Sequence, residues 1–336
     1  RRGGRRRHVL LRARGQAAEQ EQEHGALRAP RRPRTSAFRA DSKAADDAGK
    51  CALRCCAGPR AQAAKWRKLA EKQQGSAAEQ TVVGTASLFT SLDPAEAPNV
   101  CGGLLPADRL TVVGDVVTAL YGATLGAPGL LVVSGTGSIA AAMDGNGYCQ
   151  TTGGLGPLIG GDPGSAHWIA NEVLTHASVE SCNGTQSTGL TDLICRYFNI
   201  PDFQKLVPAI YSEVESAKRL AGLSQFVATS DLNGQPFWLG ILRRAGVRLA
   251  RLCEPLVARL DSAKWPGVVH VSGSVLANNT QVRESFVTEL SAKAKRTHAV
   301  ESPALSAVEG AALMALKKIV PTKVDEVAAH LVKRKA

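Results

Sequence analysis

The chain has 336 residues, of which 44% are hydrophobic and 4% aromatic, a length that fits two domains or one large α/β unit. Its net charge of +12 lies in the first 80 residues, which hold 20 Lys and Arg against 8 Asp and Glu, while the rest hold 21 of each. A neutral body argues against nucleic-acid binding. Because no apolar run approaches the ~18 residues of a membrane-spanning helix, no membrane partner is expected either.

Residues 1–45 form a basic stretch rich in Arg, Gly and Pro, without sustained periodicity. Such a composition predicts a poorly ordered leader. The eight cysteines contain no CxxC pair and are scattered along the chain, which favours reduced thiols and a cytoplasmic protein.

From about residue 60 the chain becomes regular, and strand patterns alternate with helical ones. Strands are predicted over 109–115, 129–135 and 138–145 and from 267, and helices over 61–74, 116–124, 166–178, 235–263, from about 282, and over 306–320. This alternation predicts an α/β fold.

Asp115 stands at the carboxyl end of the strand at 109–115, directly before a predicted helix. Ligand-facing groups of α/β folds usually occupy such strand ends. The alternative reading is a helix N-cap, a position where Asp is also favoured.

The segment "SGTGS" separates two predicted strands and contains no bulky side chain. Its glycines leave successive backbone N–H groups uncovered, and its three hydroxyl side chains add donors, an arrangement that can hold a phosphate oxygen. A plain hairpin turn would also use glycines here. The predicted phosphate-binding residues are Ser134, Gly135, Thr136, Gly137 and Ser138.

Two further loops resemble ligand-binding elements. Residues 151–168 contain six glycines around Asp162, and glycines at this density let a backbone approach a ligand closely or hinge, although a simple flexible loop remains the alternative. At residues 271–275, the segment "VSGSV" again places small residues directly after a predicted strand, as "SGTGS" does.

The common phosphate-site and hydrolase signatures are missing. There is no GxxxxGK[ST] loop, no HExxH zinc motif and no GxSxG elbow in the chain, which argues against a P-loop enzyme, a zincin and an α/β-hydrolase. Phosphoryl transfer needs a carboxylate base, hydrogen-bond donors already placed around the phosphate, and a cleft that closes.

Four segments occur in the order and spacing of the N-acetylglucosamine kinase family, within the wider group of BadF/BadG/BcrA/BcrD-type ATPases. They are "VVGDVVTALYGA", "GLLVVSGTGSIA", "GGLGPLIGGDPGSAHWIA" and "ALSAVEGAALMAL", and the likeness extends over about residues 100–318. The chain resembles this family, and the resemblance implies an actin-like (ribonuclease-H-like) ATPase fold of two lobes, ATP and Mg²⁺ as cofactors, and a small sugar as substrate.

The resemblance also implies a role for each matching residue. Asp115 falls at the position of the base that deprotonates the sugar 6-hydroxyl, and Thr136 with its neighbours falls on the second phosphate loop. The sugar-binding positions are Gly154, Leu155, Gly156 and Asp162, and those on the adenosine side are Ala221, Gly273 and Ser274. No direct metal ligand is identified, and a homodimer is left open.

The chain departs from the family pattern at both ends of the site. The DGGGT-like phosphate loop that opens such kinases is not found, the Trp of a GGWG segment is Leu155, and the Glu of a GDEGS segment is Pro163. The expected organisation is a leader (1–45), an incomplete first lobe (46–116), a second lobe with the three ligand loops (117–325) and a tail (326–336).

Three functions follow as hypotheses. The first is an ATP-dependent kinase for the 6-hydroxyl of N-acetylglucosamine. The second is a catalytically impaired or incomplete relative that transfers no phosphate. The third is an activator ATPase of the reductase type, which would need cysteine ligands for an iron–sulfur cluster; Cys149 lies near one loop, without an evident second cysteine.

Overall fold

The computed structural model describes residues 80–85, 107–184, 188–211, 216–260, 265–294 and 297–335. The chain divides into two compact units at residue 47, and all described residues belong to the second. The predicted leader, the helix predicted over 61–74 and most of the predicted first lobe lie outside the described residues.

Two sheets are present in the described part of the chain. A short parallel pair joins β1 (Thr81–Thr85) to β2 (Leu110–Gly114). The larger sheet has the order β5-β4-β3-β6-β7, in which β3 to β5 form an antiparallel meander while β6 and β7 run parallel to β3. Its strands are β3 (Gly129–Ser134), β4 (Ser138–Met143), β5 (Cys149–Gly153), β6 (Val268–Ser272) and β7 (Ala299–Glu301).

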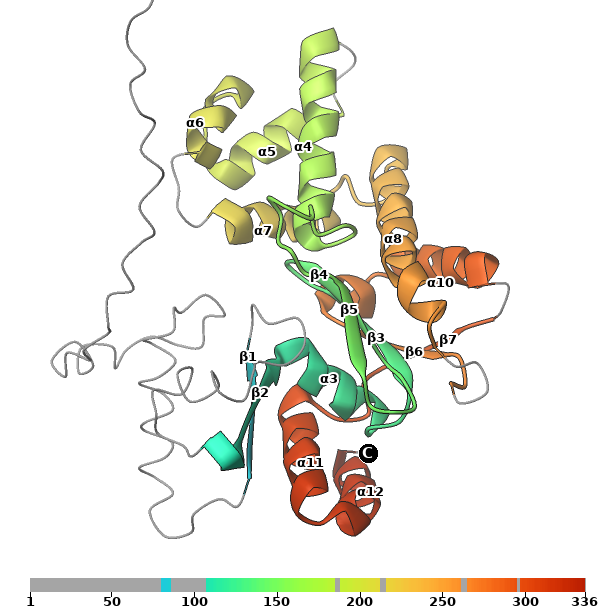
Figure 1. Cartoon of the computed structure of the whole chain (residues 1–336). Helices are drawn as coiled ribbons and strands as arrows, with labels where there is room; N and C mark the ends of the chain where they lie inside the picture. The colour runs from blue at the N-terminus through green and yellow to red at the C-terminus, as the bar shows by residue number, and fades with distance from the viewer. Residues whose placement is uncertain are drawn as a thin grey trace, which may run out of the picture. The chain divides into compact units, whose positions relative to one another are not determined.

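The helices alternate with these strands, so the predicted α/β class is confirmed (Figure 1). The longer helices are α3 (Asp115–Thr124), α4 (Ala166–Asn183), α5 (Leu190–Phe198), α7 (Ser216–Ala228), α8 (Pro236–Val257), α10 (Thr280–Ala294), α11 (Ala307–Ile319) and α12 (Val324–Lys335). The short ones are η2 (Ala107–Arg109), η3 (Phe203–Lys205), α6 (Leu206–Tyr211), α9 (Ser274–Asn278) and η4 (Pro321–Lys323). None of the described helices combines the length and apolar composition that crossing a bilayer requires.

The central strands are buried on both faces. In β3, Leu130 and Val132 face one hydrophobic cluster and Leu131 faces the other, as the two-residue period of a strand requires. The first cluster is formed with helices that include α4, α7 and α8, and the second with α3, α11 and α12. Burial on both faces explains why "GLLVV" is continuously apolar instead of alternating.

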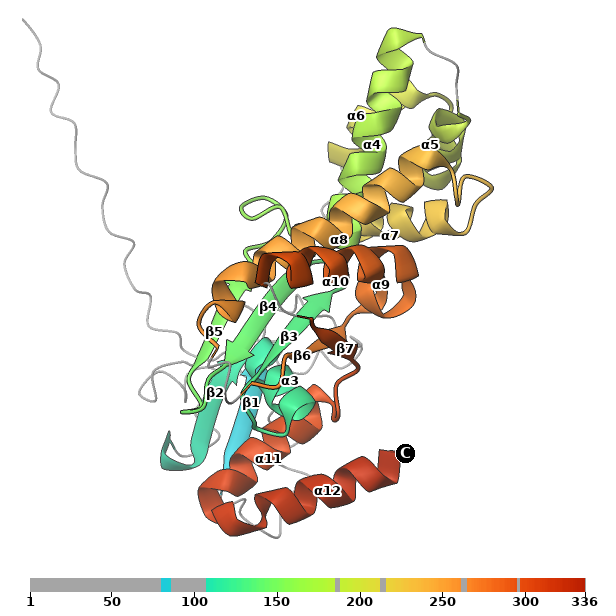
Figure 2. The same ribbon diagram turned by 90° about the vertical axis from the view of Figure 1, so that its right-hand side faces the viewer.

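Helix α8 lies beside α10 over the first face of the sheet, as Figure 2 shows. The two helices approach closely at Gly246, where an added Cβ would lie 2.7 Å from the backbone nitrogen of Phe286. On the other face, α3 contacts strands of both sheets and packs along α11. Helix α3 therefore connects the short parallel pair to the five-stranded sheet.

Several predicted boundaries differ from the structure. Helix α8 ends at Val257, before the predicted residue 263. The boundary at 116 falls inside α3, and the predicted tail from 326 falls inside α12, whose Ala328 is buried in the second cluster. We therefore assign α12 to the folded body, because its apolar face covers the sheet through α3 and α11.

Several elements were not predicted as regular structure. Strand β5 occupies residues read as loop, and strands β1 and β7 and helices α5, α6, α7 and α12 were not predicted either. The residues of β5 are polar or Gly and are only half-buried, so no apolar alternation marks this strand.

Replacing Gly310 by Ala tests the contact between α3 and α11. An added Cβ would lie 2.5 Å from the backbone nitrogen of Gly122 and would overlap the Thr118 carbonyl oxygen. Because both are backbone atoms, we expect Gly310→Ala to lower the free energy of unfolding by about 1–3 kcal/mol.

The matched control is Gly240→Ala in α8, where the added Cβ would meet only the Arg244 Nη1 atom, at 3.6 Å. This change should raise stability by about 0.5–1 kcal/mol, because alanine restricts the unfolded chain. Urea unfolding followed by circular dichroism measures both. Equal stability of the two variants would contradict the close contact.

Candidate functional site

The segment "SGTGS" forms the turn of the β3–β4 hairpin. Ser134 pairs with Ser138 across the two strands, and the Gly135 N–H donates to the Gly137 carbonyl oxygen at 3.0 Å. The segment therefore forms a hairpin turn, which was the alternative to a phosphate loop in the sequence analysis. What the turn can bind depends on where its remaining polar groups point.

The carbonyl groups of this turn face the N-terminus of α4. The Ala166 N–H donates to Gly135 O at 2.8 Å, and the His167 N–H donates to Thr136 O at 3.2 Å. The first N–H groups of a helix have no partner inside the helix, so the turn satisfies two of them. Ser165 caps the same helix by accepting from the Trp168 N–H at 3.1 Å.

The hydroxyl groups of Ser134 and Ser138 have a different role from the predicted one. Ser134 Oγ donates to Gly164 O and Ser138 Oγ donates to Pro163 O, each at 3.0 Å. Both residues are buried, Ser134 completely. Their hydroxyl hydrogens therefore join the hairpin to the segment before α4. The prediction that these two hydroxyls donate to a phosphate is wrong, because both donate to backbone carbonyls.

The tip of the hairpin keeps unused donors. Thr136 is exposed, and within the described residues no hydrogen bond is formed by its hydroxyl or by the N–H groups of Thr136 and Gly137. Adjacent N–H groups held in a fixed turn attract an oxyanion. Of the predicted phosphate-binding residues, these two provide such donors.

The glycine-rich segment begins as a continuation of β5. The Gly154 N–H donates to Ser138 O at 2.9 Å, and an added Cβ at Gly154 would lie 2.7 Å from Ile139 Cδ1. Gly154, predicted as a sugar-binding residue, is thus required by the fold. Leu155 is 51% exposed, and around Gly156 there is open space.

Asp162, which the resemblance assigns to sugar binding, lies against the hairpin: an added Cβ at Gly137 would be 2.7 Å from its Oδ2 atom. Its side chain is only 6% exposed. Burial raises the pKa of this carboxyl, and the N–H groups of Ser138 and Gly156 and the nearby His167 lower it. Burial also lowers the pKa of His167, against the raising effect of Asp162.

The segment around Gly273, which the resemblance assigns to the adenosine side, lies beside the hairpin. Strand β6 runs parallel to β3 with Ser272 opposite Val133, and Gly273 has φ of 87°. An added Cβ there would lie 2.9 Å from the Gly135 nitrogen and would overlap the Ser134 carbonyl. Only glycine fits this close approach, after which Ser274 begins α9.

Asp115 and Ala221 stand in different surroundings. Asp115 is exposed in the first turn of α3, and the N-cap is Gly114, so the N-cap alternative was wrong. Its backbone lies against the end of β1, because an added Cβ at Gly84 would be 3.3 Å from its Cα. Ala221 is buried in the core on α7, so its side chain serves packing.

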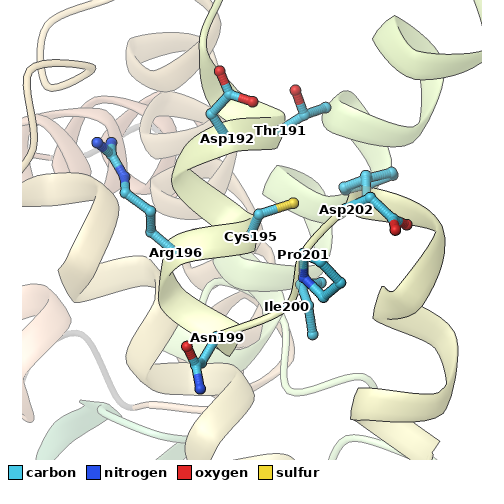
Figure 3. Close-up of a pocket in the computed structure, with 9 residues that line it drawn as sticks. Thr191, Asp192, Cys195, Arg196, Asn199, Ile200, Pro201 and Asp202 are labelled. Atoms are coloured by element: carbon cyan, nitrogen blue, oxygen red, sulfur yellow. The ribbon is translucent and has the colours of Figure 1, made fainter.

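A separate pocket of about 540 Å³ lies along α5 and the segment that follows it. Figure 3 shows the Cys195 thiol pointing between Thr191 and Asp202. Burial, Asp192 and Asp202 all raise the pKa of this thiol, which disfavours the reactive thiolate. No hairpin residue lines the pocket, so it is no part of the candidate site.

The cysteine considered for an iron–sulfur cluster is in β5. Burial raises the pKa of Cys149 to about 11, whereas a metal ligand must be the thiolate. Within the ranges that the structure describes, no three His, Cys, Asp or Glu side chains are grouped so as to hold a metal ion.

Comparison with known proteins gives a family and a fold. Residues 74–315 match the BadF/BadG/BcrA/BcrD ATPase family. The chain is 26% identical over 204 residues to the N-acetylmuramic acid/N-acetylglucosamine kinase of Clostridium acetobutylicum, covering 61% of this chain and 66% of that protein. It is 25% identical over 170 residues to the N-acetyl-D-glucosamine kinase of Dictyostelium discoideum, covering 49% and 53%.

The chain thus spans about two thirds of one relative and about half of the other. Among solved structures, a proposed N-acetylglucosamine kinase from Chromobacterium violaceum superimposes with a TM-score of 0.56 at 20% identity, over 77% of this chain and 86% of that one. The predicted actin-like ATPase fold is confirmed.

Removing single hydroxyl groups tests the roles assigned within the hairpin. Ser134→Ala leaves the buried Gly164 carbonyl without its donor, so we expect a loss of about 1–3 kcal/mol in the free energy of unfolding. Thr136→Ala removes an exposed side chain and should change stability by less than about 0.5 kcal/mol. Thermal and urea unfolding measure both, and the reverse ranking would contradict these roles.

Proposed function

We propose that this chain, which belongs to the BadF/BadG/BcrA/BcrD ATPase family, transfers a phosphoryl group from ATP to the 6-hydroxyl of N-acetylglucosamine. The names of the two relatives support an amino-sugar substrate. The observation that carries the proposal is the hairpin tip, where the N–H groups of Thr136 and Gly137 have no acceptor among the described residues.

In this proposal the hairpin tip holds the transferred phosphoryl group. The charge of phosphoryl transfer is spread over oxygens that need donors already in position. The N–H groups of Thr136 and Gly137 fit this need because α4 anchors the carbonyls of the same turn. The exposed Thr136 hydroxyl adds a donor, and the adjacent Gly273–Ser274 segment would contact the adenosine side.

Asp115 is proposed as the general base. It is an exposed carboxylate at the end of a buried strand, where it can accept the proton of a sugar hydroxyl as that oxygen attacks phosphorus. The packing of Gly84 against its backbone fixes the start of α3. Mg²⁺, which usually takes one or two carboxylates with phosphate oxygens and water, would neutralise the phosphates when bound with ATP.

Sugar-dependent release of ADP is the direct test of the proposed function. Purified protein with Mg·ATP should release ADP when N-acetylglucosamine is added, and more slowly with glucose or N-acetylmannosamine, because the sugar positions the attacking hydroxyl. A coupled ADP assay and phosphorus NMR of the product measure the rate and the modified hydroxyl. Folded protein that releases no ADP above background would refute the kinase assignment and leave the non-catalytic alternative.

Replacing Asp115 by Asn tests the base. The amide cannot take a proton, so kcat should fall by about 100- to 10,000-fold, while the binding of sugar and ATP and the unfolding temperature stay close to their original values. The matched control is Asp231→Asn, which alters another exposed carboxylate and should leave kcat unchanged. Turnover retained in Asp115→Asn would remove Asp115 from the mechanism.

A further inference from the structure

Helix α9 is a short helix between β6 and α10, and it contacts β3, β6 and α10 (Figure 2). Its Leu276 is completely buried in the first hydrophobic cluster, whereas Ser274 and Ala277 are exposed. Residues three apart lie on the same side of a helix, so these two form one exposed face of α9. This face begins beside the hairpin, because Gly273 fits closely against Gly135.

The other end of α9 is closed by a side chain from α10. The last C=O groups of an α-helix receive no N–H from within the helix. Arg283 supplies donors to two of them: its Nε atom donates to Leu276 O at 3.1 Å, and its Nη2 atom donates to Ala277 O. A guanidinium can bridge two neighbouring carbonyls in this way because its N–H groups form a fixed, planar fork.

Arg283 is itself held by a well-anchored turn. Asn279 Oδ1 accepts from the Val282 N–H at 3.0 Å, and the Asn279 carbonyl accepts from the Arg283 N–H at 3.1 Å. Val282 is completely buried, and an added Cβ at Gly246 of α8 would overlap its carbonyl oxygen. The guanidinium is therefore presented to α9 from the core contact between α8 and α10.

We propose that Arg283 is a positioning residue for the nucleotide, which holds the exposed face of α9 in line with the hairpin tip. This inference rests on the proposed function, in which the tip holds the transferred phosphoryl group and the segment Gly273–Ser274 contacts the adenosine side. Gly273 fixes the start of α9 against the hairpin, and Arg283 fixes its end. Because the proposed sugar-binding residues belong to other segments, loss of Arg283 acts on the nucleotide alone.

The variant Arg283→Met tests the position of α9. Methionine has no N–H donor but keeps a long, unbranched side chain for packing. Calorimetry on the full chain measures the Kd of a non-hydrolysable ATP analogue and, separately, that of N-acetylglucosamine. We expect the Kd of the analogue to rise by about 10- to 100-fold, because a binding element misplaced by about 1 Å has effects of that size. The Kd of the sugar should stay unchanged.

The variant Arg283→Lys tests the guanidinium itself. An ammonium keeps the charge but lacks the planar fork that reaches two carbonyls at once. The Kd of the analogue should therefore lie between the values of the original protein and of Arg283→Met. If Arg283→Met binds the analogue as tightly as the original protein, the proposal is overturned.

The matched control is Arg251→Met, which removes another arginine from the contact between α8 and α10. Arg251 Nε lies 3.5 Å from Glu289 Oε1 in an exposed ion pair, and this contact does not involve α9. Both Kd values should stay unchanged in the control. Equal weakening of analogue binding in Arg251→Met and Arg283→Met would mean a general loosening of α10 and would contradict a specific role for Arg283.

Hydrogen exchange without ligand gives a second measurement that needs no turnover. Arg283→Met should increase amide exchange over residues 274–279 and leave 154–161 unchanged, whereas Arg251→Met should change neither. Unchanged exchange over 274–279 in Arg283→Met would show that the guanidinium does not hold α9. If Arg283→Met does not fold, Arg283→Lys decides alone, and a Kd equal to that of the original protein then overturns the proposal.

The binding measurements also separate this inference from the proposed function. If the original protein binds the analogue but transfers no phosphoryl group, the kinase assignment fails, and the Kd values of the variants still decide the role of Arg283. An active kinase in which Arg283→Met leaves the Kd of the analogue unchanged would overturn this inference alone. An original protein that binds no ATP analogue would overturn both.

Discussion

The hydrogen bonds from the N-terminus of α4 to the carbonyls of Gly135 and Thr136 fix the orientation of the hairpin turn. A peptide group that points its carbonyl toward the helix points its N–H away from it. The unused donors at the tip are therefore a consequence of how the turn is anchored. The two buried serine hydroxyls strengthen the same junction by donating to Pro163 and Gly164.

This junction depends in turn on a sheet buried on both faces. Apolar residues of β3 alternate between the two clusters, so the strand that leads into the turn is packed on both faces. Parallel pairing with β6 brings Gly273 against the turn. On the far side, α3 packs on the sheet and carries Asp115 in its first turn. The elements that position the candidate site are thus those that form the core.

In the candidate site, side chains hold the structure together and backbone groups supply the exposed donors. Hydroxyl groups that look like ligand-binding groups in the sequence are buried here and hydrogen-bonded inside the protein, as with Ser134 and Ser138. Buried polar groups need partners, because leaving them without hydrogen bonds is costly. The exposed donors are mainly backbone N–H groups, which the glycines of "SGTGS" indicate in the sequence.

The sequence by itself determined the α/β class, the strands β3, β4 and β6 and the family resemblance, because apolar runs and glycine-rich turns are local signals. It also located the hairpin and the segment at Gly273 that lies beside it. Only the tertiary structure decided that β5 is a strand, since its polar residues are recognised through pairing with β4. Likewise, it decided the roles of the Ser134 and Ser138 hydroxyls, because these groups donate to backbone carbonyls 30 and 25 residues away, and such contacts leave no trace in spacing or composition.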